Sequence, residues 1–483
     1  MSLPRDRIVF YLNQTRHEVT GRDVLMNLSD YLRYEQGLTG TKVVCAEGDC
    51  GACTVLKASV HELSRNRFVF RTVNSCILPV LNLDGCQMVT VEGLKKNAEL
   101  HPVQNAMIQN FGSQCGFCTP GFICAISGLV EDSIVNKKII TEKRTKNYLT
   151  GNLCRCTGYD PIIKSAMAID LGQVETLQDR FHDRKKINEL KSLVKNEVEI
   201  HAGVGKIFLP TTLKKALEIL KKGPQTQIVG GATDLGVAIN KGRLQYQSVM
   251  SLQNIETLWK IKKTKDFLII PSRVTLSTLQ KHLENYFPEM EKMLNLFASP
   301  QIKNSGTLVG NLVNASPISD TIPFLMMSDA VVEVQKLNSK RNIPIHKFIL
   351  GYKKLDLKAG ELVTAIHIPL LKGKQISKLY KVSVRKDLDI SAVTMAVRLK
   401  LNGSKIEEAR LVFGGVGPTV QRLTNIESGW VGQEVTSDLI ISAAEKIQSF
   451  VSPISDVRGS KEYRQLLCKN LLRKFADEIQ VSL

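Results

Sequence analysis

The chain has 483 residues, of which 43% are hydrophobic, and a formal net charge of +19. This length allows roughly two to four domains with separate cores. No stretch approaches the about 18 consecutive apolar residues of a membrane span, and the N-terminal residues lack an apolar signal core, so we expect a soluble cytoplasmic protein without a membrane partner. The positive charge could attract nucleic acid, but the lysines are dispersed with few aromatic residues between them, which favours an ordinary solvated surface.

Ten of the eleven cysteines lie between Cys45 and Cys156. In a cytoplasmic protein such clustering indicates metal ligation rather than disulfide bonds. Structural zinc is one possibility, although zinc sites usually combine two short Cys-x2-4-Cys knuckles. A triplet spaced Cys-x4-Cys-x2-Cys with a distant fourth cysteine is instead the plant-ferredoxin spacing of a [2Fe-2S] cluster. The sequence therefore predicts a cluster bound by Cys45, Cys50, Cys53 and Cys76.

Short strand-like segments surround this cysteine loop. Leucines at helical spacing predict one helix over residues 24–34. Strands and one helix around a cysteine loop predict a compact β-grasp-like domain, similar to plant ferredoxin, over residues 1–92. The expected strands are residues 7–13, 54–56, 68–70 and 88–91.

Residues 93–172 have longer helical patterns and a second group of clustered cysteines. Thiols near the starts of antiparallel helices can be brought together, and a Cys-x-Cys pair is too tight for a standard zinc knuckle. Cys124 lies in an apolar run and is expected in the core rather than at a cluster. We therefore predict a helical domain with a second [2Fe-2S] cluster on Cys115, Cys118, Cys154 and Cys156.

Residues 173–200 are rich in charged side chains and are expected to form an interdomain linker with some helix. An α+β domain should follow over residues 201–372, with an early helix at 213–222. The last part, residues 373–483, is predicted to form a smaller C-terminal α+β lobe.

Within residues 201–372, a strand runs into a glycine-rich loop at 227–236. Such a loop offers bare backbone N–H groups to an anion such as pyrophosphate. A second set of small, hydrogen-bonding residues lies at 306–320. Two such loops in one domain favour a nucleotide cofactor.

The most specific motifs of the chain are Glu47–Val55, Gln114–Gly121, Gly151–Tyr159 and Ala315–Asp320. Together they resemble the iron–sulfur and flavin subunit of the molybdenum hydroxylase family, of the xanthine dehydrogenase type. The resemblance extends over the whole chain in order. It implies a multidomain α+β fold that consists of a β-grasp ferredoxin-like domain (1–92), a helical [2Fe-2S] domain (93–172), a linker (173–200), a vanillyl-alcohol-oxidase-like FAD-binding domain (201–372) and a C-terminal flavoprotein lobe (373–483).

The resemblance also implies which residues bind FAD. Phe297 would lie over the flavin ring, although a core position is the simpler interpretation of a lone aromatic residue. Thr307 and Asn311 would bind the phosphates, and Asp320 would bind the adenosine end or the ribose. The other implied residues are Val363 beside the ring, Lys381 at the cofactor, and a pyrophosphate loop of Val229, Gly230, Gly231, Ala232, Thr233, Asp234, Leu235 and Gly236.

The implied function is an electron relay. We expect electrons to pass from the molybdenum site of a larger partner subunit, where hypoxanthine and xanthine are oxidised to urate, through the two [2Fe-2S] clusters to FAD and on to NAD+. The resemblance places Gln114 and the second cluster nearest the partner's molybdopterin and implies a dimer of heterodimers. No side chain of this chain is expected to be catalytic, because redox cofactors carry the chemistry.

Two alternative functions remain open. The same relay could serve another molybdenum hydroxylase, such as an aldehyde or N-heterocycle dehydrogenase, because the substrate is chosen by the partner. The chain could also be a non-enzymatic, zinc-stapled binding module with a basic face.

Two residues of the first cysteine loop depart from the family pattern, because Ala46 and Asp49 stand where glycine is usual. If either position needs a positive φ, aspartate tolerates it better than alanine. Asp49 also places a negative charge beside the cluster, which should lower the reduction potential of that cluster.

Overall fold

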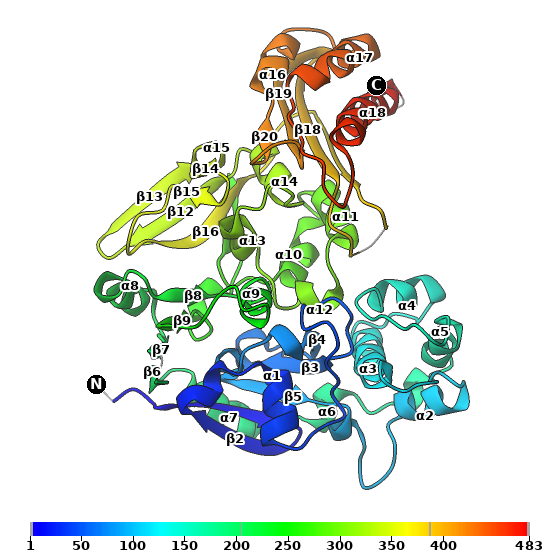
Figure 1. Ribbon diagram of the computed structural model, residues 1–483, viewed down its shortest axis with the longest axis vertical. Coiled ribbons are helices and arrows are strands. Elements are labelled where there is room, and N and C mark those ends of the chain that lie inside the picture. Colours follow the sequence, from blue (N-terminus) through cyan, green and yellow to red (C-terminus); the bar gives the residue numbers. More distant parts are fainter. Residues whose placement is uncertain (1–2, 204, 386–387, 481–483) are drawn as a thin grey trace. The chain divides into compact units, whose positions relative to one another are not determined.

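The computed structural model describes residues 3–203, 205–385 and 388–480 (Figure 1). The chain divides into two compact units. The first unit comprises Met1–Trp259 and Ser299–Gly306, and the second comprises Lys260–Ala298 and Thr307–Leu483. No helix in the described ranges is long and apolar enough to cross a membrane.

The first unit begins with a five-stranded sheet in the order β2-β1-β5-β3-β4. β1 and β5 are parallel, and the other neighbours are antiparallel. Side chains of β1 alternate between two cores, with Phe10 in one and Tyr11 in the other, as the period of a strand requires. The strands are β1 (Arg7–Leu12), β2 (Thr15–Thr20), β3 (Thr54–Ser59), β4 (Arg71–Asn74) and β5 (Cys86–Val89).

Two local predictions in this domain need correction. The helix expected over 24–34 is broken into a 3-10 turn (Gly21–Leu25), the short α1 (Leu28–Asp30) and a π-helical turn (Tyr31–Glu35). Backbone hydrogen bonds with residues 78–80 replace helical ones at the break. Residues 68–70 are not a strand, because β4 pairs with β3 only from Arg71 onward.

Four helices form the next part of the first unit. The apolar face of α3 packs with α2 and α5 in a core that also receives one face of the sheet. Cys124 is fully buried in this core, as predicted. The helices are α2 (Pro102–Gln109), α3 (Thr119–Val135), α4 (Glu142–Tyr148) and α5 (Asp160–Met167).

The segment 173–200 packs onto the same core through α6 (Leu177–Arg180) and α7 (Arg184–Leu193). The carboxylate of Glu131 on α3 accepts hydrogen bonds from the backbone N–H groups of Leu177 and Gln178 at 2.7 and 2.9 Å. These bonds satisfy donors that the first turn of a helix leaves free. The segment is therefore an ordered part of the first unit.

A small α/β layer completes the first unit, with strand order β6-β7-β9-β8. The predicted helix at 213–222 is confirmed as α8, which buries Ala216, Leu217 and Leu220. Its N-cap Thr212 accepts from the Lys215 N–H at 3.2 Å. The elements are β6 (Val198–His201), β7 (Lys206–Leu209), α8 (Leu213–Lys222), β8 (Gln227–Val229), α9 (Leu235–Asn240) and β9 (Val249–Ser251). From the later segment of the same unit, α12 (Pro300–Lys303) packs against β4.

The second unit contains an antiparallel sheet in the order β10-β11-β16-β12-β13, with helices packed against it in one apolar core. A short hairpin, β14-β15, follows α15. The elements are β10 (Lys262–Lys263), β11 (Phe267–Pro271), α10 (Leu276–Leu283), α11 (Pro288–Leu296), α13 (Leu308–Asn314), α14 (Ile322–Met327), β12 (Val331–Lys336), β13 (Ser339–Pro344), α15 (Ile345–Phe348), β14 (Ile349–Gly351), β15 (Lys354–Leu355) and β16 (Leu362–Pro369).

The C-terminal part of the second unit is a four-stranded antiparallel sheet, β17-β18-β19-β20, covered by three helices. Its strand β18 is buried along almost its whole length. The elements are β17 (Gln375–Val382), β18 (Val393–Asn402), β19 (Lys405–Gly414), β20 (Gln421–Arg422), α16 (Thr424–Trp430), α17 (Ser437–Lys446) and α18 (Lys461–Gln480).

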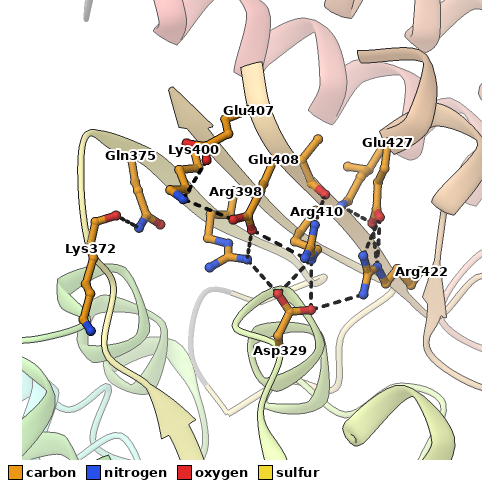
Figure 2. Close-up of polar contacts among 12 residues, drawn as sticks. Asp329, Lys372, Gln375, Arg398, Lys400, Glu407, Glu408, Arg410, Arg422 and Glu427 are labelled. Carbon is orange, nitrogen blue, oxygen red and sulfur yellow. Dashed lines mark hydrogen bonds and ion pairs between the residues drawn. The ribbon is translucent and has the colours of Figure 1, made fainter. Parts of the chain in front are cut away.

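An arginine cluster ties this sheet to the end of α14 (Figure 2). Asp329 accepts from Arg398 of β18 and Arg410 of β19 at 2.8 Å, and from Arg422 of β20 at 3.2 Å. Glu427 pairs with Arg422 at 2.8 Å. One carboxylate thus holds three neighbouring strands, and the nearby acids balance the charge of the arginines.

Candidate iron–sulfur and flavin sites

The first four candidate ligands form one thiol group, the first thiol set. Cys53 precedes β3 and Cys76 lies in the 3-10 turn after β4, and their Sγ atoms are 3.2 Å apart. The Cys45 thiol lies within hydrogen-bonding reach of the thiols of Cys50 and Cys76. Its interactions with Cys50 and then Cys76 outweigh burial and hold the pKa of Cys45 well below its usual range.

The backbone of the loop also turns toward these sulfurs. The N–H groups of Glu47 and Cys50 both point to the Cys45 Sγ at 3.4 Å. Gly51 has a φ of +68°, and a Cβ there would overlap the carbonyl oxygen of Gly151. Glycine is required at this position because both the backbone conformation and the close approach exclude a side chain.

Ala46 and Asp49, the two residues that depart from the family pattern, have different backbone conformations. Ala46 has a φ of +54°, in the left-handed region, whereas Asp49 is not among the residues with positive φ. The left-handed conformation is disfavoured for alanine because its Cβ crowds the backbone. The loop therefore carries local strain at the residue that follows the first ligand.

The second four candidate ligands form the second thiol set. The Sγ atoms of Cys115 and Cys156 are 3.3 Å apart, and the thiols of Cys118 and Cys154 lie within hydrogen-bonding reach. Burial, followed by the interaction with Cys154, raises the pKa of Cys118 to about 12. Cys118 is the N-cap of α3. Unlike the deeply buried Cys53 and Cys76, Cys115 and Cys156 are exposed.

The donor chemistry of both sets fits a two-iron cluster. A [2Fe-2S] cluster is held by four cysteine thiolates, two on each iron, and each set contains four cysteines arranged in close pairs. Across the described ranges, no group of three or more His, Cys, Asp and Glu side chains has an arrangement that could hold a metal ion. The described geometry therefore does not close either thiol set into a metal-binding group, and the fit to a two-iron cluster rests on the kind and number of the donors.

A buried hydrogen-bond network connects the two thiol sets. The N–H of Leu153 donates to the Cys50 carbonyl at 2.9 Å, and Asn152 Nδ2 donates to the Gly51 carbonyl at 3.0 Å. Gln301 Nε2 in turn donates to Asn152 Oδ1 at 2.8 Å. Sequence reasoning assigned no role to Asn152, although it lies in the motif Gly151–Tyr159, and missed Gln301, because no spacing pattern marks a contact between such distant segments.

The candidate pyrophosphate loop, residues 229–236, belongs to the first unit and connects β8 to α9. The predicted strand before it is confirmed as Gln227–Val229. Ala232 in the loop has a φ of +62°, and the Gly236 N–H donates to its carbonyl at 2.7 Å. The loop is therefore a tight turn that leads directly into a helix.

The other candidate FAD residues belong to the second unit. Thr307 caps α13 by accepting from the Gly310 N–H at 3.0 Å. One turn later, Asn311 Oδ1 accepts from the hydroxyls of Ser319 and Thr321, both at 2.6 Å. The helix α13 and the loop after it are thus joined by side-chain hydrogen bonds.

Asp320 lies in that loop, and its carboxylate is engaged on both oxygens. Lys381 of β17 donates to Oδ2 at 2.6 Å, and Ser391 donates to Oδ1 at 2.5 Å. Phe297 and Val363 pack on the same apolar core, with Phe297 half-buried at the end of α11 and Val363 buried on β16. Sequence reasoning missed Ser391, which no motif distinguishes.

Four protein-family profiles match consecutive parts of the chain. They are the 2Fe-2S iron-sulfur cluster binding domain over residues 10–81, the [2Fe-2S] binding domain over 90–167, the FAD binding domain in molybdopterin dehydrogenase over 196–371 and the CO dehydrogenase flavoprotein C-terminal domain over 378–479. The two thiol sets lie in the two iron–sulfur domains.

Curated relatives match nearly the whole chain. Xanthine dehydrogenase of Emericella nidulans is 30% identical over 98% of this chain and 39% of the relative. Xanthine dehydrogenase 1 of Arabidopsis thaliana is 30% identical over 97% of this chain and 39% of the relative. The chain therefore spans about two fifths of the length of the relatives that it matches.

Solved structures of similar fold cover a little more than half of the chain. A carbon monoxide dehydrogenase structure from Hydrogenophaga pseudoflava has a TM-score of 0.53 and 20% identity, over 56% of this chain and 94% of that chain. Quinoline 2-oxidoreductase from Pseudomonas putida 86 has a TM-score of 0.52 and 22% identity over the same shares. These likenesses show the fold. The four domains in this order, with the xanthine dehydrogenases that match the chain from end to end, show that it belongs to the molybdenum hydroxylase family as an iron–sulfur and FAD chain.

Proposed function

We propose that the chain is the electron-relay subunit of a xanthine dehydrogenase, carrying electrons from a molybdenum-binding partner to NAD+. The single observation that supports this most is the presence of two four-cysteine thiol sets beside an FAD-binding domain in one chain. The matching curated relatives are named xanthine dehydrogenase, which supports this substrate. The eight cysteines of the two sets are proposed as the ligands.

The unequal exposure of the two thiol sets supports a direction for the relay. Cys115 and Cys156 are exposed, and the neighbouring Phe117 is 48% exposed. Cys53 and Cys76 are buried. A surface cluster suits exchange with a partner, whereas a buried one suits exchange inside the chain. We therefore assign electron entry to the second set, next to Gln114, and onward transfer to the first.

The residues proposed to contact FAD in the first unit are those of the loop 229–236. Those proposed in the second unit are Phe297, Thr307, Asn311, Asp320, Val363 and Lys381. When bound, the clusters exchange single electrons and FAD exchanges electron pairs with a nicotinamide. The chain's own residues would hold these groups, exclude water from them and set their potentials. Thiolate ligation requires loss of the proton that burial holds on Cys118, so cluster assembly at this site would release protons.

A second candidate function is the same relay in a different molybdenum hydroxylase. It is favoured by the fold likeness to carbon monoxide dehydrogenase and quinoline 2-oxidoreductase. The two candidates use this chain in the same way, since the partner's molybdenum site would select the substrate. They are distinguished by which compound reduces the complex.

The test is to purify the chain without oxygen and to measure iron, acid-labile sulfide, zinc and flavin. We expect about four irons, four sulfides and one FAD per chain, from two two-iron clusters and one flavin domain. Zinc without flavin would overturn the proposal.

The chain is then co-expressed with its molybdenum-binding partner, and size-exclusion chromatography should give a dimer of heterodimers. Xanthine should reduce this complex, and NADH should reduce it from the flavin end; reduction by an aldehyde or N-heterocycle instead would identify the second candidate.

A further inference from the structure

Asn240, the last residue of α9, uses its whole side-chain amide at the first thiol set. Its Nδ2 donates to the carbonyl oxygens of Ala46 and Cys76, both at 2.8 Å. Its Oδ1 accepts from Asn27 Nδ2 at 2.6 Å. Both donors and the acceptor are therefore engaged, which fixes the orientation of the amide.

These two carbonyls belong to opposite ends of the thiol set. Ala46 follows Cys45, the first candidate ligand, and Cys76 is the last. Ala46 also has the left-handed backbone that is disfavoured for alanine. The hydrogen bond from Asn240 to the Ala46 carbonyl stabilises this turn. The second hydrogen bond, to the Cys76 carbonyl, holds the distant fourth ligand to the same amide group.

Packing fixes Asn240 in place. A Cβ on Gly236 would lie 2.6 Å from the carbonyl oxygen of Ile77, so the helix sits directly on the segment after the last ligand. Val237 packs against Cys53, Cys76 and Ile77. On the surface, Lys241 forms an ion pair with Glu47. The start of α9 adjoins the loop 229–236, and its end contacts the thiol set.

We propose that Asn240 is a positioning residue for the first [2Fe-2S] cluster, an inference that rests on the proposed function. Its amide holds the first and last ligand segments in the shape that binds the cluster. It also places the positive end of a dipole against two carbonyl oxygens beside the cluster. Reduction adds negative charge to the cluster, so loss of this dipole should disfavour the reduced state and lower the reduction potential.

The test uses two variants of the complete chain, purified without oxygen. Asn240→Ala removes both donors. Asn240→Asp keeps the size but replaces the donating Nδ2 with a carboxylate oxygen, which then faces both carbonyls. We expect the first cluster to be lost to a chelator roughly tenfold faster in either variant, since two partly buried hydrogen bonds are removed. Electron paramagnetic resonance should show an altered signal and a lower potential for this cluster alone. The second cluster, on residues 115–156, is the internal reference.

A matched control and a rescue variant separate positioning from general damage. Asn110→Asp changes another partly buried asparagine of the first unit whose Nδ2 donates to a backbone carbonyl, that of Ala106 at 2.9 Å, and it should leave the first cluster unchanged. Ala46→Gly removes the strain at the turn, so adding it to Asn240→Ala should recover part of the lost cluster retention.

The outcomes distinguish this inference from the proposed function. Wild-type protein without iron, sulfide or FAD would overturn the proposed function. Wild-type protein with both clusters, and Asn240 variants with unchanged chelator rates, signal and potential, would overturn only the role of Asn240. Equal loss of both clusters in the variants, with no rescue by Ala46→Gly, would also overturn it, since that result indicates general unfolding.

Discussion

The Nζ atom of Lys381 lies 2.6 Å from Oδ2 of Asp320, and both side chains are almost completely buried. The other carboxylate oxygen accepts from Ser391 at 2.5 Å. Both residues were predicted to bind FAD, but here each is the other's partner within the second unit. Asp320 therefore has a structural role that is independent of any cofactor, and loss of FAD in an Asp320 variant would have two possible causes.

Breaking this ion pair should lower the free energy of unfolding even in protein without FAD. Asp320→Ala leaves the Lys381 ammonium buried without its partner, which costs about 3–5 kcal/mol. Combining it with Lys381→Met should cost less than the sum of the two single changes, because no charge is then left unpaired. Denaturant unfolding of flavin-free protein measures this, and additive effects would contradict the coupling.

Cys118→Ser should separate the two halves of the proposed relay. Serine is a poor substitute for a thiolate toward iron, so the second cluster should be lost or altered. Turnover from purine to NAD+ in the complex should collapse, while NADH oxidation by an acceptor that takes electrons at the flavin should continue. Cys124→Ala is the control, since Cys124 is a core residue of the same helix and its loss should leave the cluster in place. Equal effects of the two substitutions would contradict the assignment of Cys118 as a ligand.

Phe297→Ala should weaken FAD retention about tenfold or more, because a stacked aromatic ring contributes roughly 1–3 kcal/mol by burial. Flavin content after extensive dialysis is the measurement. Tyr286→Ala is the matched control, since Tyr286 is also partly buried against the same core. Equal flavin loss in the two variants would show that Phe297 acts only through the core.

Ala46→Gly should stabilise the cluster-free first unit by about 1 kcal/mol or less. Glycine relieves the strain of the left-handed backbone at a φ of +54°. The gain is small because glycine also has more conformational freedom in the unfolded chain, which opposes folding. Asp49→Gly, at the neighbouring departure from the family pattern, lacks the positive φ and should destabilise instead. Thermal unfolding of the two variants compares them directly, and a lower midpoint for Ala46→Gly would contradict the strain.

Glu333 in the second unit predicts a dependence of stability on pH. Burial raises the pKa of this carboxylate, but hydrogen bonds from His367 and Lys340, and then from Thr364, outweigh burial and hold the pKa well below its usual range. The pKa of Glu333 is thus lower in the folded protein than in the unfolded chain, where it is about 4.3. Its contribution to stability is complete at pH values above the unfolded pKa and is lost as the pH falls toward the folded pKa.

Glu333→Gln should therefore lower the unfolding midpoint at pH 7, and the difference from wild type should shrink as the pH falls from 5 to 3. Glu284→Gln removes the same charge at an exposed position and should change the midpoint little. A difference for Glu333→Gln that stays constant over this pH range would contradict the ionised, hydrogen-bonded carboxylate.

Local signals in the sequence were sufficient for the domain types and for several elements. The spacing of Cys45, Cys50 and Cys53 indicated an iron–sulfur loop, and the helix at 213–222 was predicted to the residue. A strand leading into the loop that ends at residue 236 was also predicted, without its bounds. These features depend on neighbours within a few positions, such as a capping threonine or a thiol three or five residues away. The same reasoning predicted a continuous helix over 24–34, which is wrong because residues 78–80 compete for its backbone hydrogen bonds.

Only the tertiary structure decided which distant residues meet. Asn240 joins Ala46 to Cys76, Gln301 reaches Asn152, and Ser391 shares Asp320 with Lys381. Asn240, Gln301 and Ser391 stand in no spacing pattern, because a hydrogen bond between remote segments depends on how helices and sheets pack. The conformation of Ala46 was likewise undecided, since an alanine in the sequence does not show whether its φ is positive. The cysteine spacing therefore indicates the kind of metal site, whereas the tertiary packing determines which side chains hold those thiols in place.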